Sequence, residues 1–191
     1  MKRGIQQLID QADAGNKQAA DQLFAALYDE LHRLAEYNLR QGAPQTLGAT
    51  TLLHEAYLNI AGRPDVAFTD RARFLSYASR AMRGLVIDYA RRRRAQKRGR
   101  QFEITLVEDL QSQRSDLPPI DELEHIGAAL DELARLEPGL VEVVDLHFFG
   151  GYTFGEIATL RSVSERTVQR DWRKARLLLH AIVANQSLPI D

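Results

Sequence analysis

Hydrophobic side chains recur every three to four positions along most of this chain, which is the spacing of amphipathic helices rather than of strands. In the first half, the pattern and its capping residues predict four helices. They run over residues 5–14, from Asn16 to about Leu39, from Thr50 or Thr51 to Gly62, and from Thr69 or Asp70 into the arginines at 91–94. In the fourth helix the expected buried stripe is Phe74, Ala78, Ala81, Leu85 and Tyr89, and the residues expected off it are Tyr77, Arg80, Arg83, Gly84 and Arg91.

The second half begins with a stretch that has no clear period. Residues 101–120 contain Pro118-Pro119, and we interpret them as a linker. Periodicity returns in a helix from about Asp121 to Leu136. Pro138-Gly139 is expected to separate that helix from the segment LVEVVDLHFF, which Gly150-Gly151 ends. With the two helices that follow, these segments predict a four-helix domain.

Residues 153–180 are typical of a helix-turn-helix. Thr153 and Glu156 have the spacing of a capping box, and Ser164 is a good N-cap for a longer helix after the turn at 161–163. On that helix the inward positions are Val168, Trp172, Ala175 and Leu179, and another face carries Arg166, Gln169, Arg170 and Arg173. Such long donors suit a recognition helix that reads base edges in the major groove. The alternative is a surface helix with a solvated basic face, and we expect Trp172 in the core rather than stacked on a base.

Charge is distributed unevenly, although the formal net charge of the 191 residues is only −1. Residues 71–100 contain eleven basic side chains and one acidic, whereas residues 101–145 contain two basic and twelve acidic ones. Residues 161–176 are basic again, with six basic and two acidic side chains. Two basic blocks separated by an acidic block favour contacts with a polyanion at two places.

Composition narrows the class of protein. The sequence is 45% hydrophobic and 27% charged, which is typical of a globular chain. No apolar run approaches the roughly 18 residues of a membrane span, and the N-terminal stretch is polar where a signal peptide needs an apolar core. We therefore expect a cytoplasmic protein with no membrane partner. Because the chain has no cysteine, it forms no disulfide and no thiolate metal site.

Two helices in the first half have side chains suited to binding a partner, in addition to those that a hydrophobic core would bury. The helix at 50–61 is apolar on more than one side, which indicates either a tight core or a site for a partner. The helix that begins near residue 70 has aromatic and basic side chains off its buried stripe and continues into Arg91–Arg94. Such a run is usually a solvated tail, but aromatic rings beside arginines also suit single-stranded or melting DNA.

Sequence motifs for catalysis are missing. There is no glycine-rich phosphate loop, no Ser/His/Asp set and no zinc motif. The cluster DELEH at 121–125 is better explained as an acidic first turn that suits the helix dipole than as a metal site. A metal-dependent hydrolase is the weakest alternative, and it would have to be built on that cluster or on Asp29, Glu30 or Glu36. We expect no enzyme, no metal and no cofactor.

Taken in order, the helices that end in a basic block, the linker and the helix-turn-helix resemble the sigma factors of bacterial RNA polymerase. The size and two-domain plan resemble the extracytoplasmic-function (ECF) group, over about residues 15–100 and 122–183. TLLHEAYLNI is similar to the family's polymerase-binding helix, and FLSYASRAMRGLVIDYARRRR to its promoter-melting helix. LHFFGGYTFGEIATLRSVSERTVQRDWRKARLLL is similar to its DNA-reading domain. HEAYL, MRGLVIDYARRRR and SERTVQRDW look closest to an ECF-like branch.

Some positions depart from the family's pattern. Tyr77 stands where many ECF proteins have Trp, and Gly84 where many have Asn, both near the captured promoter base. Arg161-Ser162 replaces the usual Leu-Gly of the turn. The first two departures bear on base preference, and the third bears on the geometry of the turn.

The resemblance implies three sets of site residues and no catalytic residue. The set that would dock on the clamp of the polymerase's largest subunits is His54, Glu55, Tyr57 and Leu58. The set that would hold the melted minus-ten element is Tyr77, Arg80, Arg83, Gly84, Asp88, Arg91 and Arg92. The minus-thirty-five element would be read by Gln169, Arg170, Arg173 and Lys174, with Ser164 and Arg166 on its phosphates. The acidic linker would pass through the polymerase.

The sequence thus predicts an all-α protein of two small helical domains joined by a flexible acidic linker. The expected division is an N-terminal sigma domain at 1–98, the linker at 99–120, a C-terminal helix-turn-helix domain at 121–185 and a tail at 186–191. We expect a sigma factor that binds core RNA polymerase and promoter DNA and directs transcription initiation, and the resemblance allows an anti-sigma factor as a further partner. The alternative is a stand-alone regulator whose N-terminal domain dimerises or senses a signal. That alternative gives no role to the surfaces at 50–61 and 74–94.

Overall fold

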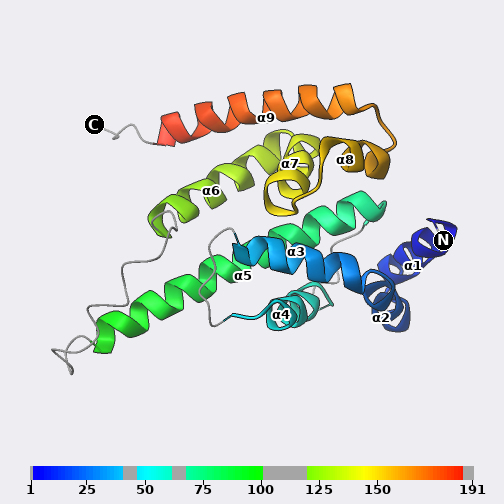
Figure 1. The fold of residues 1–191 in the computed structure, drawn as a ribbon, viewed down its shortest axis with the longest axis horizontal. Coiled ribbons are helices and arrows are strands. Elements are labelled where there is room, and N and C mark those ends of the chain that lie inside the picture. Colours follow the sequence, from blue (N-terminus) through cyan, green and yellow to red (C-terminus); the bar gives the residue numbers. More distant parts are fainter. Residues whose placement is uncertain (1, 41–46, 62–67, 101–119, 187–191) are drawn as a thin grey trace.

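The computed structural model describes residues 2–40, 47–61, 68–100 and 120–186. Within these ranges the elements are helices and none is a strand, which confirms the all-α prediction for this part of the chain (Figure 1). In chain order they are α1 (Lys2–Asp13), α2 (Lys17–Ala26), α3 (Tyr28–Arg40), α4 (Ala49–Ala61), α5 (Arg71–Arg100), α6 (Ile120–Leu136), α7 (Pro138–Val144), the π-helical turn η1 (Asp145–Phe149), α8 (Phe154–Arg161) and α9 (Glu165–Gln186). Residues 101–119 of the predicted linker and residues 187–191 of the predicted tail lie outside the described ranges. No helix in these ranges has both the length and the hydropathy that crossing a bilayer requires.

Several helix ends lie where the capping residues predict them. The side chain of Asn16 accepts a hydrogen bond of 3.2 Å from the N–H of Ala19, so Asn16 is the N-cap of α2. Asp70 has the same role for α5, because its Oδ1 accepts a hydrogen bond of 2.9 Å from the N–H of Arg73. Gly15 follows α1 with a φ of 86°, a left-handed conformation that favours a residue without a Cβ. Local sequence therefore accounts for these boundaries.

The single helix predicted from Asn16 to Leu39 is wrong, because Leu27 separates α2 from α3. Leu27 has a φ of −107° and a ψ of 10°, outside the helical region. Its N–H still bonds to the carbonyl of Leu23 at 3.0 Å, and its carbonyl still accepts from Leu31 at 2.9 Å. Only 1% of Leu27 is exposed, so the apolar period continues through a one-residue bend. Periodicity alone does not reveal such a bend.

The predicted break between the helix that ends at Leu136 and the segment LVEVVDLHFF is present, but it lies at Glu137, and Pro138-Gly139 already begin α7. Proline suits the first turn of a helix, where its missing N–H is not needed. After α7 the chain continues directly into η1, and Gly150 follows that turn. The segment LVEVVDLHFF is therefore α-helical at its start and π-helical at its end.

The helix predicted from Thr50 or Thr51 begins slightly earlier, at Ala49. Its first turn is closed by a hydrogen bond of 3.0 Å from the N–H of Leu52 to the carbonyl of Gly48. Differences of one or two residues are common at helix ends, where the last turns fray. The predicted end of this helix, at residue 62, lies outside the described residues.

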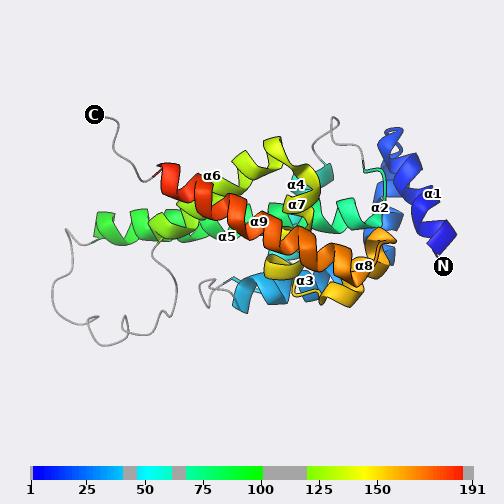
Figure 2. The same ribbon diagram turned by 90° about the horizontal axis from the view of Figure 1, so that it is seen from above.

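Helix α5 runs through the middle of the molecule, between two groups of helices. Helices α3 and α4 pack on one side of it and α6, α7 and α8 on the other, while α9 forms an outer layer (Figures 1 and 2). We call residues 2–100 the N-terminal half and residues 120–186 the C-terminal half. One apolar core joins the two halves, since Leu75 and Met82 of α5 are buried in the same cluster as Val143, Leu146 and Ile157.

The buried surface of α5 is wider than the predicted stripe. Phe74 and Ala78 are buried as predicted, whereas Ala81, Leu85 and Tyr89 are only half-buried. The other buried positions of α5 are Ala72, Leu75, Ser76, Ser79, Met82, Arg83, Val86 and Ala90. The prediction that Arg83 lies off the buried surface is therefore wrong. Two groups of helices cover α5 from different sides, and a single helical period identifies only one of them.

Candidate nucleic-acid interface

The first helix of the predicted helix-turn-helix begins with the capping box that the sequence predicts. The Oγ1 of Thr153 accepts a hydrogen bond of 3.2 Å from the N–H of Glu156. In return, Oε2 of Glu156 accepts 2.8 Å and 2.9 Å hydrogen bonds from the N–H and the hydroxyl of Thr153. The bond from the backbone N–H holds the pKa of the Glu156 carboxyl below its ordinary value. The start of α8 is thus fixed by two neighbouring side chains.

The turn between α8 and α9 keeps a tight geometry although its left-handed position is occupied by a serine and not by a glycine. Ser162 adopts the left-handed conformation, with a φ of 55° and a ψ of 41°. The N–H of Val163 then bonds to the carbonyl of Ala158 at 3.0 Å, which closes the end of α8. Ser164 precedes α9 directly, and its Oγ accepts a hydrogen bond of 3.1 Å from the N–H of Thr167. The predicted N-cap is confirmed.

Arg161 connects this turn to two other helices. Its Nε lies 3.3 Å from Oε1 of Glu142 on α7, and its Nη1 lies 3.3 Å from Oδ2 of Asp171 on α9. All three side chains are largely buried, with exposed fractions of 18% or less. Arg161 therefore forms an ionic link that orients α9 against α7 and α8.

The inward face of α9 agrees with the prediction. Val168 and Ala175 are fully buried. Trp172 is half-buried and packs against both apolar clusters, with its ring centroid 4.8 Å from that of His147. Leu179 packs against the cluster in the C-terminal half. The indole of Trp172 is therefore part of the core, as expected, rather than a free surface for stacking.

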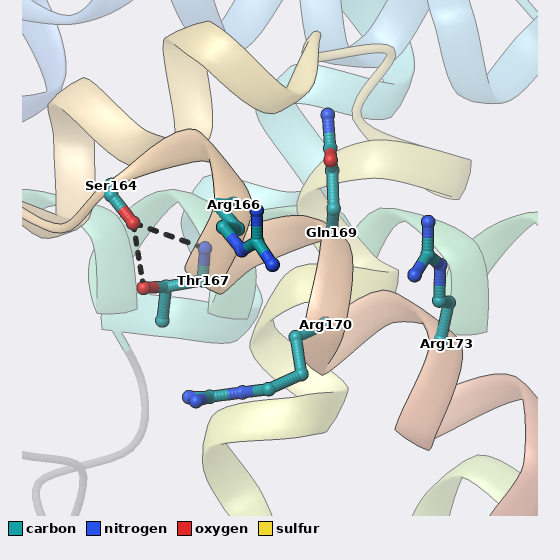
Figure 3. Close-up of a pocket in the computed structure, with 6 residues that line it drawn as sticks. All are labelled: Ser164, Arg166, Thr167, Gln169, Arg170 and Arg173. Atoms are coloured by element: carbon teal, nitrogen blue, oxygen red, sulfur yellow. Dashed lines mark hydrogen bonds between the residues drawn. The ribbon is translucent and has the colours of Figure 1, made fainter.

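The opposite face of α9 forms a concavity, which we call the α9 concavity (Figure 3). It is lined by Ser164, Arg166, Thr167, Gln169, Arg170 and Arg173. Five of these are residues that the sequence assigns to the minus-thirty-five element. The sixth assigned residue, Lys174, lies outside the concavity and pairs at 2.7 Å with Glu137, the residue just before α7. Thr167 was not predicted, although its spacing of three residues from the N-cap Ser164 was a signal for it.

The arginines of the α9 concavity are open to solvent. Arg170 is 76% exposed, and its Nη2 lies 3.6 Å from Oδ1 of Asp171. Among the described residues, Arg166 and Arg173 have no ion-pair or hydrogen-bond partner. Gln169 donates a hydrogen bond of 3.1 Å to Oε1 of Glu165. Three guanidinium groups and one amide are thus available on one face of a helix, as phosphate and base-edge contacts require.

The residues assigned to the minus-ten element are divided between two environments on α5. Gly84, Asp88, Arg91 and Arg92 are exposed, and Nη1 of Arg91 lies 3.8 Å from Oδ1 of Asp88. A Cβ added at Gly84 would meet no heavy atom within 4 Å, so this position faces open space. Tyr77 is half-buried, with its ring edge-on to that of Phe68 at a centroid distance of 5.3 Å.

The other two assigned residues, Arg80 and Arg83, hold a carboxylate of the C-terminal half. Nη1 of Arg83 lies 2.8 Å from Oδ1 of Asp145, and Nη2 and Nε of Arg80 both lie 3.2 Å from Oδ2. The hydroxyl of Ser76 donates to the same Oδ2 at 3.3 Å. The guanidinium of Arg83 also covers the ring of Phe149 at 4.6 Å. We call these four polar side chains, with Asp145 at their centre, the Asp145 cluster.

Burial controls the electrostatics of the Asp145 cluster. Asp145 has no exposed surface, and burial raises the pKa of its carboxyl while the charges of Arg83 and Arg80 oppose that rise. Burial likewise lowers the pKa of the Arg83 guanidinium, against the attraction of Asp145. A sequence signal for this cluster existed, because Asp145 is the lone acidic residue between Val143, Val144 and Leu146, and a carboxylate in an apolar run is seldom buried without a partner.

The residues assigned to polymerase binding lie on α4. His54, Glu55 and Leu58 are exposed, and Leu58 has 54% of its surface open. Tyr57 is half-buried, because its hydroxyl donates a short hydrogen bond to Asp21 and its ring packs edge-on to that of Phe24 at 4.6 Å. The bond to Asp21 raises the pKa of the Tyr57 hydroxyl. An apolar groove beside it is lined by Asp21, Phe24, Ala25, Tyr28, Thr50, Leu53, His54 and Tyr57.

The alternatives that invoke a metal find no support in the part of the chain that the structure describes. No group of three or more His, Asp or Glu side chains there could hold a metal ion. Glu30 is instead paired with Arg71, and Glu36 lies 3.7 Å from Arg40. The side chains of residues 121–124 lie outside the described residues.

Comparisons with known proteins identify the family. A family model described as "ECF sigma factor" matches residues 2–185. Among solved structures, that of CnrH in complex with the cytosolic domain of CnrY is similar, with 23% sequence identity. The match covers 96% of this chain and 99% of that chain, and the TM-score is 0.38. No curated protein sequence matches. The family is not a class of enzymes, and its members bind core RNA polymerase and promoter DNA. Because the matching segment extends over nearly the whole chain, this protein belongs to the ECF sigma factor family and directs transcription initiation from promoters.

Proposed function

We propose that the α9 concavity reads the minus-thirty-five element of the promoter in the major groove. The observation that carries this proposal is the gathering of five assigned residues in one concavity with three exposed guanidinium groups (Figure 3). Gln169, Arg170 and Arg173 suit base edges, while Ser164 and Arg166 at the start of α9 suit phosphates. Lys174 is a weaker candidate, since its ammonium is already paired with Glu137. Thr167 joins the set as a phosphate contact.

The exposed stripe of α5 is proposed to hold the minus-ten element. Gly84 offers open space for a flipped or unstacked base, and Arg91 and Arg92 are placed to follow phosphates. Tyr77 lies at the N-terminal end of the same stripe, with its ring half-exposed. Arg80 and Arg83 belong to this surface only when they are released from Asp145.

The outer face of α4 is proposed to bind core RNA polymerase. Leu58 supports this assignment, because an exposed leucine on a short helix beside an apolar groove is typical of a protein-binding surface. His54 and Glu55 flank it on the same exposed side. Tyr57 contributes by packing α4 onto α2, so its role is to position the helix.

In this proposal the chain has two functional domains, at 1–98 and 121–185, that bind promoter DNA at two places while the polymerase supplies the chemistry. We propose that it acts in the cytoplasm without a membrane partner and that an anti-sigma factor is a further partner. The acidic residues between the domains would then occupy a basic channel of the polymerase.

Co-elution with core RNA polymerase on a size-exclusion column tests the proposal. Wild type is expected to form a stoichiometric complex that Leu58→Glu abolishes, because the substitution places a charge in an apolar contact. Leu136→Glu is the matched control, since Leu136 is exposed to a similar extent, 59%, on α6. Equal loss in both variants would point to a general defect, and no complex with wild type would contradict the proposed polymerase surface.

A further inference from the structure

We infer that Asp171 is a positioning residue for promoter recognition, because it holds the guanidinium of Arg170 in the orientation that reads one base pair of the minus-thirty-five element. The inference rests on the proposed role of the α9 concavity. It goes further, because it assigns a role in sequence specificity to a side chain that does not line the concavity.

Asp171 places one carboxylate oxygen against each of two arginines. Its Oδ2 lies 3.3 Å from Nη1 of Arg161, and its Oδ1 lies 3.6 Å from Nη2 of Arg170. On its other side, Arg161 has its Nε 3.3 Å from Oε1 of Glu142. Opposite charges therefore alternate from α7, through the last residue of α8, to α9. We call Glu142, Arg161, Asp171 and Arg170 the Asp171 row.

The Asp171 row is buried at one end and open at the other. The exposed fractions of the Glu142, Arg161 and Asp171 side chains are 13%, 18% and 16%, whereas that of Arg170 is 76%. Largely buried ion pairs are screened much less by salt than exposed ones, so the first three side chains fix one another. A carboxylate that is anchored from inside the domain thus lies beside an arginine that is open to solvent.

This anchoring decides how Arg170 is oriented. Adjacent residues on a helix do not face each other, so the contact between Arg170 and Asp171 depends on the direction of the Asp171 carboxylate. Arg161 fixes that direction by binding the second oxygen. In Figure 3 the side chain of Arg170 extends away from those of Gln169 and Arg173. The carboxylate therefore restricts Arg170 to one side of the helix.

The other two arginines of the α9 concavity differ from Arg170. Arg166 and Arg173 have no ion-pair partner in the part of the chain that the structure describes. An arginine that rotates freely suits phosphates, whereas two parallel hydrogen bonds to the edge of a guanine require a planar fork in a fixed orientation. The strongest base preference is therefore expected from Arg170, the arginine whose orientation the fold controls.

The test measures the base preference of the holoenzyme at each position of the element. Holoenzyme is bound to a duplex DNA library that is randomised across the minus-thirty-five element, and the bound fraction is sequenced. Arg170→Ala is expected to lower the preference at one base pair about tenfold, which is the discrimination lost with a bidentate contact. Asp171→Asn is expected to lower the preference at the same base pair about fivefold, because a free Arg170 has to be ordered for that one contact.

Asp171→Asn is a narrow change, because the amide oxygen can stay on Arg161 and only the group facing Arg170 becomes an NH₂. When Arg170 is already alanine, Asp171→Asn is expected to change the base preferences no further, since the side chain through which it acts is gone. Arg161→Lys is the second variant. A lysine keeps the charge but loses the fork that spans Glu142 and Asp171, so a smaller loss is expected at the same base pair.

Glu132→Gln is the matched control. It is also a change from an acid to its amide, and it removes a 2.8 Å ion pair with Arg135 on α6 in the same half of the molecule. All base preferences should stay as in wild type. Thermal melting and co-elution with core polymerase show whether each variant folds and forms holoenzyme, and Arg161→Lys tests the inference if Asp171→Asn does not.

The possible failures are separable. The inference is overturned, and reading by the concavity stands, if Asp171→Asn keeps the wild-type preferences, weakens binding equally on all sequences or acts at another base pair than Arg170→Ala. Additive losses in the double variant, or an equal loss in Glu132→Gln, overturn it as well. If Arg170→Ala relaxes the preference at no base pair, the proposed reading role of Arg170 fails and the inference fails with it.

Discussion

The two helices proposed to contact DNA present their arginines in opposite ways. On α9, Arg170 is 76% exposed and lines a concavity with two further arginines that have no partner among the described residues. On α5, Arg83 is 7% exposed and is fixed by a carboxylate from 62 residues away in the sequence. The comparison shows that a motif locates the helix, whereas the neighbouring helices decide which of its residues are available. The arginines of the α9 concavity are open to solvent, whereas Arg83 of α5 is covered and paired.

The largest expected effect is that of removing Asp145, and it is on the free energy of unfolding. Asp145→Ala removes the partner of a buried guanidinium, and an unpaired buried charge costs roughly 3–5 kcal/mol. The free energy of unfolding falls by that amount, so the urea midpoint falls as well. Arg170→Ala is the control from the exposed surface, and it should change the free energy of unfolding by no more than about 0.5 kcal/mol. Similar midpoints for the two variants would show that the Asp145 cluster does not stabilise the fold.

The next effect is on promoter binding by the holoenzyme. Arg170→Ala should weaken binding by about 1–3 kcal/mol and relax the preference for the minus-thirty-five sequence, because a lost base contact affects some sequences more than others. Arg176→Ala is the control, since Arg176 is exposed on α9 but does not line the concavity. Electrophoretic mobility shifts on matched and mismatched promoters measure both quantities. Equal weakening on every sequence would make Arg170 a phosphate contact.

A smaller effect is expected at the capping box, which supports α9 without touching DNA. Thr153→Ala should lower the free energy of unfolding by about 1 kcal/mol, because the start of α8 loses its cap. The pKa of Glu156 is lowered in the folded chain, so the stability that it contributes is complete above its ordinary pKa of 4.5 and is lost as the pH falls through the lowered value. Urea unfolding at neutral pH and below pH 4.5 measures both effects. A difference between wild type and Thr153→Ala that grows on acidification would contradict this account.

The smallest expected effect concerns the exposed arginines of α5 and the salt dependence of DNA binding. Arg91 and Arg92 are exposed in the structure, so they can reach phosphates directly. Replacing both by glutamine should reduce the salt dependence of single-stranded DNA binding by about 1.4 in the log–log slope, at roughly 0.7 for each phosphate contact. Arg40→Gln is the control. An unchanged slope would mean that both arginines stay in solvent and make no contact with phosphates.

Local features of the molecule could be predicted from the sequence, and its long-range features could not. The caps at Asn16, Asp70 and Ser164 depend on residues within one turn, and the α9 concavity depends on spacing along one helix. The bend at Leu27 and the burial of Arg83 depend instead on packing against segments far away in the chain. Periodicity along a helix identifies one apolar face, so it does not show that a second side of α5 is also buried.

The turn between α8 and α9 is a second feature that could not be predicted from local sequence. A serine in place of glycine makes a left-handed residue harder to predict, yet Ser162 adopts that conformation. The structure supplies a reason, because Arg161 next to it is held by Glu142 and Asp171 from two other helices. Those partners are distant in sequence, so the residue that departs from the family's pattern gains its stabilisation from tertiary contacts.

The π-helical turn η1 makes the packing between the two halves sensitive to chain length. A π turn contains one residue more than an α turn, and such turns often arise as single insertions in an α-helix. Deleting Phe148, which is exposed, would return the turn to the α-helical count and displace Phe149 and Tyr152 by one position relative to Asp145. The rings under Arg83 and Arg33 would then lose their register while every charge stayed in place. An insertion or deletion at this point would therefore change how the two halves pack against each other, without altering the residues of the α9 concavity.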